Sequence, residues 1–160
     1  LWLDPQNAIQ FAYKIAQVRG QQKPQYAAKK KKNAQIFAQK VNLQSQQFKQ
    51  QFARLNHRNY VAYHDAYQYL EDALGLNFKG SISISPEQKP SAKHLLQLKQ
   101  QVKKYQWHCL LTEPQFDKSL ADKVFGTTGR YTMVDETFSQ ASSYEQGFKQ
   151  MADAIYNCLK

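Results

Sequence analysis

The chain has 160 residues, 42% of them hydrophobic, and a formal net charge of +10. This length suits one domain with a buried core, or one domain plus an appendage. No apolar stretch approaches the roughly 18 residues that a membrane-spanning helix needs, so the composition excludes that class. The first residues look like the inside of an ordered motif and show no signal-peptide pattern, so we expect a fragment.

The positive charge lies in the first part of the chain. Residues 1–60 hold eleven basic residues and one acid, Asp4, whereas residues 61–160 hold eleven of each sign. A run such as residues 29–32, four lysines, can mark a surface for nucleic acid or an anionic membrane. Consecutive lysines spread around a helix, however, and no arginine-rich reading face accompanies them, which favours a solvated helix face. A basic α/β binding module acting through residues 14–58 is the alternative function.

Two helices are predicted before residue 59. Asp4 and Pro5 are typical of an N-cap and a first helical position, and Gly20 predicts the end of this helix after residue 19. Pro24 opens a second helix, which should continue to about residue 56. Its apolar residues recur every three or four positions, with Ser45 in the one gap: Ala34, Phe37, Val41, Phe48, Phe52 and Leu55. At about 48 Å this helix would extend beyond a domain about 33 Å across.

From residue 60, strand and helix patterns alternate. The predicted strands are residues 60–63, 81–85, 107–112 and 130–134, and residues 79–80 and 126–129 are predicted turns. The predicted helices are residues 65–74, 91–105, 114–124 and 142–159. This alternation is typical of an α/β fold with right-handed crossovers. We therefore predict a four-stranded parallel sheet flanked by helices and preceded by one long helix.

Three of the predicted strands end at an ionisable side chain: His64, Glu113 and Asp135. Parallel strands all point the same way, so these groups should gather at one edge of the sheet. Imidazole nitrogen and carboxylate oxygen are both zinc ligands. Asp135 could equally cap the turn that follows it, and Glu113 better fits a helix start. There is no G-x-S-x-G elbow and no phosphate-binding glycine loop, so we expect neither an enzyme nor a catalytic residue.

The two cysteines lie in apolar patterns. Cys109 belongs to the third predicted strand, and Cys158 lies on the apolar stripe of the last predicted helix. That stripe comprises Tyr144, Phe148, Met151, Ile155 and Cys158. Position alone leaves open whether the two thiols form a bridge or are buried independently. A bridge would close a loop of about 50 residues and would indicate an oxidising compartment.

Three segments resemble motifs of the bacterial high-affinity zinc-uptake solute-binding proteins, the cluster A-I capture components of ABC importers. The segment YVAYHDAYQYLEDALGL, residues 60–76, is similar to their motif F-H-D-A-Y-x-Y-F/L-E-x-x-x-G-L, whose histidine is a zinc ligand. The opening LWLDP resembles H-x-W-x-[DS]-P without its histidine, and TEPQF, residues 112–116, resembles their E-P-Q-F turn. Manganese-binding members carry Glu in place of the histidine, so His64 indicates zinc.

The resemblance implies a periplasmic protein that captures zinc and delivers it to the membrane subunit of an ABC permease. Members of this family have two lobes joined by one long helix, with the metal between the lobes. By this resemblance residues 1–23 are a remnant helix of the N-terminal lobe, residues 24–58 are the interlobe backbone helix, and residues 59–160 are the C-terminal α/β lobe. The first lobe would then be missing, and the chain would carry half of the metal site.

The resemblance also implies roles for single residues. His64 would be a zinc ligand, Asp135 matches the carboxylate ligand of manganese-binding members, and Cys109 and Cys158 match the disulfide pair of many zinc-binding members. With half a site, zinc binding by this chain should be weak or absent. We expect no nucleic-acid partner, and the exposed long helix could mediate dimerisation.

Overall fold

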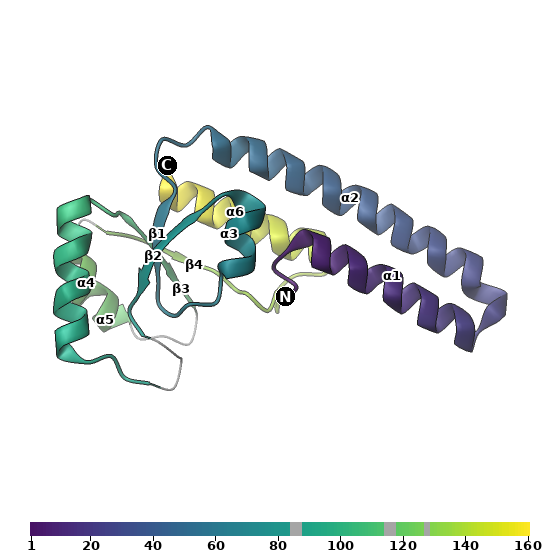
Figure 1. The fold of residues 1–160 in the computed structure, drawn as a ribbon, viewed down its shortest axis with the longest axis horizontal. Helices are drawn as coiled ribbons and strands as arrows, with labels where there is room; N and C mark the ends of the chain where they lie inside the picture. The colour runs from purple at the N-terminus through teal and green to yellow at the C-terminus, as the bar shows by residue number, and fades with distance from the viewer. Residues whose placement is uncertain (84–87, 114–117, 127–128) are drawn as a thin grey trace.

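The computed structural model describes residues 1–83, 88–113, 118–126 and 129–160. It consists of a four-stranded parallel sheet with helices on both faces, and of a helical hairpin that projects away from the sheet (Figure 1). The predicted fold class is therefore confirmed. Among the described helices, none combines the length and the hydrophobicity of a transmembrane segment.

The hairpin is formed by α1 (Pro5–Gln22), the short 3-10 helix η1 (Pro24–Tyr26) and α2 (Ala27–Ala53). Asp4 caps α1 as predicted, because its Oδ1 accepts a hydrogen bond from the Gln6 backbone at 2.8 Å. Gly20 does not end this helix, which continues to Gln22. A Cβ at Gly20 would lie 3.3 Å from the Cβ of Ala27, so this glycine serves the close approach of two helices.

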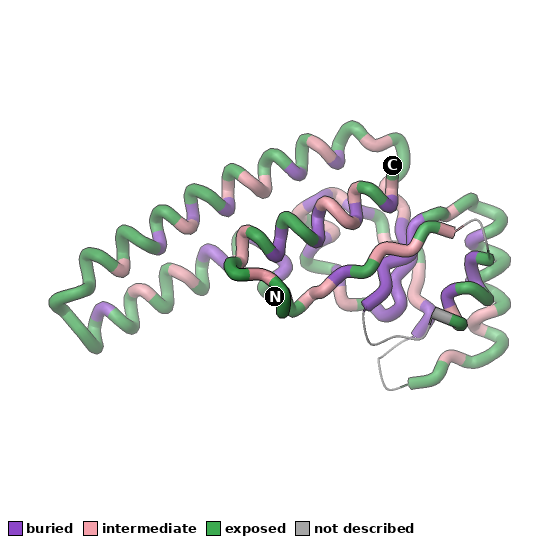
Figure 2. The backbone as a smooth tube through the Cα atoms, turned by 180° about the vertical axis from the view of Figure 1, so that it is seen from behind, coloured by how far each residue is buried: buried purple, intermediate pink, exposed green. Residues whose placement is uncertain are grey.

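The apolar stripe of α2 packs on two different partners. Its first half lies against α1, where Ala38 and Val41 form a small core with Ile9. Its second half lies against the sheet domain, where Phe48 and Phe52 pack edge-on against Phe148 and Tyr156 of α6. The helix thus extends beyond the sheet domain, as predicted, and α1 covers one side of the extension (Figures 1 and 2). It ends at residue 53, three residues earlier than predicted, in a last turn tightened by i→i−3 hydrogen bonds.

The sheet has the order β2-β1-β3-β4, with all neighbouring strands parallel. The strands are β1 (Asn59–Ala62), β2 (Asn77–Ser81), β3 (Cys109–Thr112) and β4 (Arg130–Met133). The prediction for the second strand was wrong, because β2 includes residues 79–80, which were predicted as a turn. Gly80, with φ +154°, lies where the register between β1 and β2 shifts, so it belongs to a bulge in an edge strand. Residues 84–85 of the predicted strand lie outside the described residues.

The two faces of the sheet carry separate cores, because successive strand residues point to opposite faces. Tyr60, Ala62 and Leu111 face α2, α3 (Gln68–Leu74) and α6 (Tyr144–Leu159). Val61, Tyr63 and Leu110 face α4 (Ala92–Tyr105) and α5 (Lys118–Phe125). The start predicted for α5, at residue 114, lies outside the described residues. The central strands β1 and β3 are thus buried on both faces, which is typical of parallel sheets, whereas the edge strands β2 and β4 are partly exposed.

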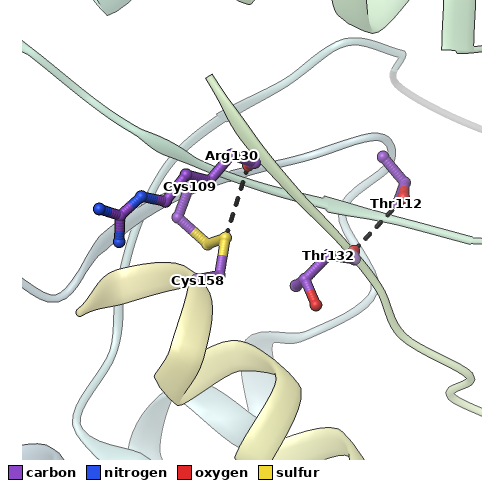
Figure 3. The surroundings of a disulfide bond; sticks show 5 residues. All are labelled: Cys109, Thr112, Arg130, Thr132 and Cys158. Atoms are coloured by element: carbon purple, nitrogen blue, oxygen red, sulfur yellow. Dashed lines mark hydrogen bonds between the residues drawn. A yellow bond between two sulfur atoms is a disulfide. The ribbon is translucent and has the colours of Figure 1, made fainter. Parts of the chain in front are cut away.

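A disulfide joins Cys109 of β3 to Cys158 in the last turn of α6 (Figure 3). The two Cα atoms are 5.3 Å apart and both side chains are buried. This confirms the pairing that the family resemblance implied. The bridge fastens α6 to the middle of the sheet, 49 residues away in sequence.

Reducing this disulfide should lower the free energy of unfolding by about 4 kcal/mol, because the unfolded chain regains the freedom of the closed loop. Urea unfolding with and without a phosphine reductant measures the difference. The double variant Cys109→Ser with Cys158→Ser is the control and should unfold like the reduced protein. Equal stability of the oxidised and reduced chains would show that the bridge contributes nothing.

Candidate metal centre

His64 and Glu113 meet at the carboxyl edge of the sheet. His64 lies two residues after the end of β1, and Glu113 directly follows β3, the strand that pairs with β1. The His64 Nδ1 atom is 2.7 Å from Glu113 Oε1. Both residues are buried, with exposed fractions of 9% and 3%. The predicted gathering of strand ends therefore brings an imidazole and a carboxylate into direct contact.

Tyr67 is hydrogen-bonded to the Glu113 carboxylate. Its hydroxyl donates to Glu113 Oε1 at 3.1 Å, and its side chain is fully buried in the core that the sheet forms with α2, α3 and α6. Burial, and then the charge of Glu113, raise the pKa of Tyr67 far above its ordinary value. Tyr67 therefore remains a neutral donor at any physiological pH, and it fixes which way the carboxylate faces.

Glu136 is the third donor of the cluster and comes from the turn after β4. One ligand atom from each of His64, Glu113 and Glu136 lies within 4.8 Å of the others. The charge of Glu136 also contributes to the raised pKa of Tyr67, which agrees with its place beside the pair. One nitrogen and two carboxylate oxygens are a donor set that zinc accepts.

Glu136 was not among the residues predicted from the sequence, where the neighbouring Asp135 was the candidate ligand. The available signal was a pair of consecutive acids shortly after a strand end. Sequence spacing does not say which of the two faces the sheet edge. The path of the turn after residue 133 decides it.

Asp135 binds its own turn and does not belong to the three-residue cluster. Its Oδ1 accepts hydrogen bonds from the backbone and hydroxyl of Thr137, at 2.9 and 2.6 Å, and its Oδ2 accepts both from Ser139 at 2.7 Å. These hydrogen bonds, the one from the Thr137 hydroxyl foremost, lower the pKa of Asp135 to about 2. This geometry favours the capping alternative for Asp135 over the alternative of a metal ligand.

The remaining candidates lie away from the centre or partly outside the described residues. Glu113 was also predicted to start a helix. That helix start would lie at residues 114–117, which are outside the described residues. His94 is half-buried on α4, where its Nε2 lies 2.7 Å from the backbone oxygen of Ser81. His57 and His108 are exposed. His108 directly precedes β3 and so lies at the opposite end of this strand from Glu113.

Comparison with protein families gives a match over residues 1–158 to the family "Zinc-uptake complex component A periplasmic". The high-affinity zinc uptake system protein ZnuA of Brucella abortus (strain 2308) is 31% identical over 163 residues, which cover 99% of this chain and 49% of that protein. ZnuA of Haemophilus ducreyi is 30% identical, with 99% and 53% covered. The chain therefore spans about half the length of these relatives.

The fold of the chain is similar to that of solved structures of metal-binding and adhesin proteins. The laminin-binding protein Lmb of Streptococcus agalactiae, described as an adhesin with metal-transporting activity, has a TM-score of 0.88 and 26% identity, covering 99% of this chain and 63% of that chain. A zinc-bound mutant variant of AdcAII from Streptococcus pneumoniae has a TM-score of 0.83 and 29% identity, with 99% and 60% covered.

The capping role of Asp135 can be tested by its titration. In Thr137→Val the pKa of Asp135 should rise from about 2 toward its ordinary value of 3.8, because the hydroxyl that stabilises the carboxylate is lost. Since the native pKa is the lower one, the stabilisation is fully present above pH 3.8 and is lost as the pH falls through about 2. NMR of the side-chain carboxyl across the acidic range measures the shift. Thr137→Ser, which keeps the hydroxyl, should titrate like the unmodified chain.

Proposed function

The chain belongs to the family of periplasmic zinc-uptake components, and from this premise we propose that it captures zinc in the periplasm and hands the ion to the membrane subunit of an ABC permease. The proteins of this family bind and transport a solute and are not enzymes. The observation that carries the proposal within this chain is the cluster of His64 and Glu113, both buried, with the half-buried Glu136 at the carboxyl edge of the sheet.

The contact between His64 and Glu113 suggests how the imidazole would be held. Nδ1 lies 2.7 Å from Glu113 Oε1, so in the proposed arrangement this side of the ring faces the carboxylate and Nε2 is the nitrogen that binds the ion. Such a carboxylate orients the ring. In this arrangement Glu113 orients the imidazole and does not itself bind the ion, so of the three residues of the cluster His64 and Glu136 are the two zinc ligands.

The cluster has fewer donors than a closed zinc site, which takes four ligands in a tetrahedron. We therefore propose that the centre is one half of a site between two lobes, and that groups outside these 160 residues complete it. The length of the relatives, about twice that of this chain, supports this reading. Residues 1–23, 24–58 and 59–160 would be a helix of the other lobe, the interlobe helix and the C-terminal lobe.

A half-site should bind zinc with a dissociation constant weaker than nanomolar. Titration against a competing chelator measures it. His64→Ala should weaken binding by at least about a hundredfold, because even residues that act through a ligand typically contribute ten- to a hundredfold. His108→Ala, which removes an exposed imidazole at the other end of β3, is the matched control and should bind like the unmodified chain. Zinc binding that survives His64→Ala would contradict the proposed site.

Asp135 was also predicted as a ligand, and the same titration decides its role. Asp135→Asn keeps most of the shape of the side chain but loses the charge. If Asp135 caps its turn, zinc binding by this variant should change far less than in Glu136→Gln, because Glu136 lies in the cluster. A loss in Asp135→Asn as large as in His64→Ala would instead make Asp135 a ligand.

A further inference from the structure

The turn that carries Glu136 is held by residues far away in sequence. Glu136 does not lie on a strand, since β4 ends at Met133. Its position therefore depends on what holds residues 135–139. The hydrogen bonds of Asp135 close the turn on itself, but they do not attach it to the rest of the protein.

Trp2 attaches the turn to the start of the chain. Its indole Nε1 donates a hydrogen bond to the backbone oxygen of Glu136 at 2.7 Å, across 134 residues of sequence. The backbone oxygen of Trp2 in turn accepts a hydrogen bond from the Tyr144 hydroxyl at 2.9 Å. The indole is 48% exposed, so core packing does not explain why it lies there. Its directed contact is with the peptide of a candidate metal-binding residue.

Phe138 holds the other end of the same turn in an uncommon backbone conformation. Its φ is +57°, a left-handed value that is unfavourable for an aromatic residue and that persists only when the surroundings enforce it. Its ring packs edge-on against Tyr144, with centroids 5.6 Å apart. A Cβ at Gly147 would lie 2.3 Å from Phe138 Cγ, so only glycine at position 147 accommodates this ring. Strain of this kind clusters at functional sites.

Tyr144 connects these contacts with the helical hairpin. Besides Trp2 and Phe138, it meets Phe37 of α2 at a centroid distance of 5.7 Å and stacks on Phe148 of α6. The hairpin, the last helix and the turn therefore share one side chain. Tyr144 thus links residues 1–4 and the hairpin to the turn that carries Glu136.

We propose that Trp2 is a positioning residue for zinc binding: its indole N–H holds the peptide of Glu136 so that the carboxylate faces His64. This inference rests on the proposed function and deepens it. A metal site needs its ligands held to within about 0.5 Å, and a turn meets this demand only when neighbouring side chains restrain it. Trp2 touches no metal in this arrangement. It acts through the backbone of the residue that does.

The test is Trp2→Phe, which keeps an aromatic ring and removes the indole donor. Zinc affinity, measured by chelator competition, should fall about three- to tenfold, the range of one net hydrogen bond. The melting temperature of the zinc-free chain should stay nearly unchanged, because the indole is half-exposed. Tyr105→Phe, another exposed aromatic residue, is the control and should leave zinc affinity unaltered, because Tyr105 precedes β3 whereas Glu113 follows this strand.

Two further measurements separate positioning from a structural role. In a double-mutant cycle, Trp2→Phe should add no loss in the Glu136→Gln background, because the carboxylate that it positions is gone. Zinc should also slow hydrogen exchange of the Trp2 indole N–H by the same three- to tenfold factor, since coupling between the two is reciprocal. The Trp2→Phe spectrum identifies that signal against Trp107.

The outcomes distinguish this inference from the proposed function. If His64→Ala abolishes zinc binding while Trp2→Phe leaves it unchanged, Trp2 is not a positioning residue and the zinc site stands. An equal loss from Trp2→Phe with and without the Glu136 carboxylate also overturns the inference, because the effect is then structural. Zinc binding that does not depend on His64 overturns the proposed function and this inference together.

Discussion

The direct pairing of β1 with β3 is the constraint on which the centre depends. The register aligns residues 60–62 of β1 with residues 109–111 of β3. The pairing continues one residue beyond β1, where the Tyr63 N–H donates a hydrogen bond to the Leu111 carbonyl at 2.8 Å. Because the strands are parallel and in this register, the residues that follow them emerge side by side. His64 and Glu113 therefore meet, although 49 positions separate them in sequence.

The same two strands, β1 and β3, contribute buried side chains to the cores on both faces of the sheet. One face receives α2, α3 and α6, and the disulfide from Cys109 fastens α6 there. The other face receives α4 and α5. A centre built on strands buried on both faces is held more firmly than one built on loops, which suits a site whose ligands must stay in place before the ion arrives. Glu136, on a turn, is the exception, and the contacts of Trp2 and Phe138 compensate for it.

The helical hairpin differs from the sheet domain in charge and packing. Residues 5–53 include nine basic residues and no acid. One of its lysines, Lys30, lies over the ring of Tyr26 at 5.1 Å. Several apolar side chains of both helices are exposed, among them Phe11, Ile15, Ile36 and Leu43. These features fit the proposed place of the hairpin between two lobes, because part of its surface would then be covered.

Local patterns in the sequence by themselves determined the helices and the class of the fold. Apolar residues three and four positions apart identified α2 and α6, since this spacing reflects helix geometry and needs no knowledge of the partner. The same stripe indicated that Cys158 is buried, and the strand-to-helix junction placed His64 at the carboxyl edge. The cysteine pairing needed the family resemblance, because position alone left the bridge undecided.

Only the tertiary structure decided what each group touches. Gly20 is typical of a helix end, yet its missing side chain is used for contact with Ala27. Gly80 suggested a turn, but the neighbouring strand β1 draws it into an edge strand. Asp135 and Glu136 are consecutive acids, and the turn directs the first to its own backbone and the second to His64. For Gly80 and Glu136 the outcome depends on atoms supplied by a distant segment, and for Gly20 and Asp135 it depends on the path of the turn that follows, so no local pattern contains that information.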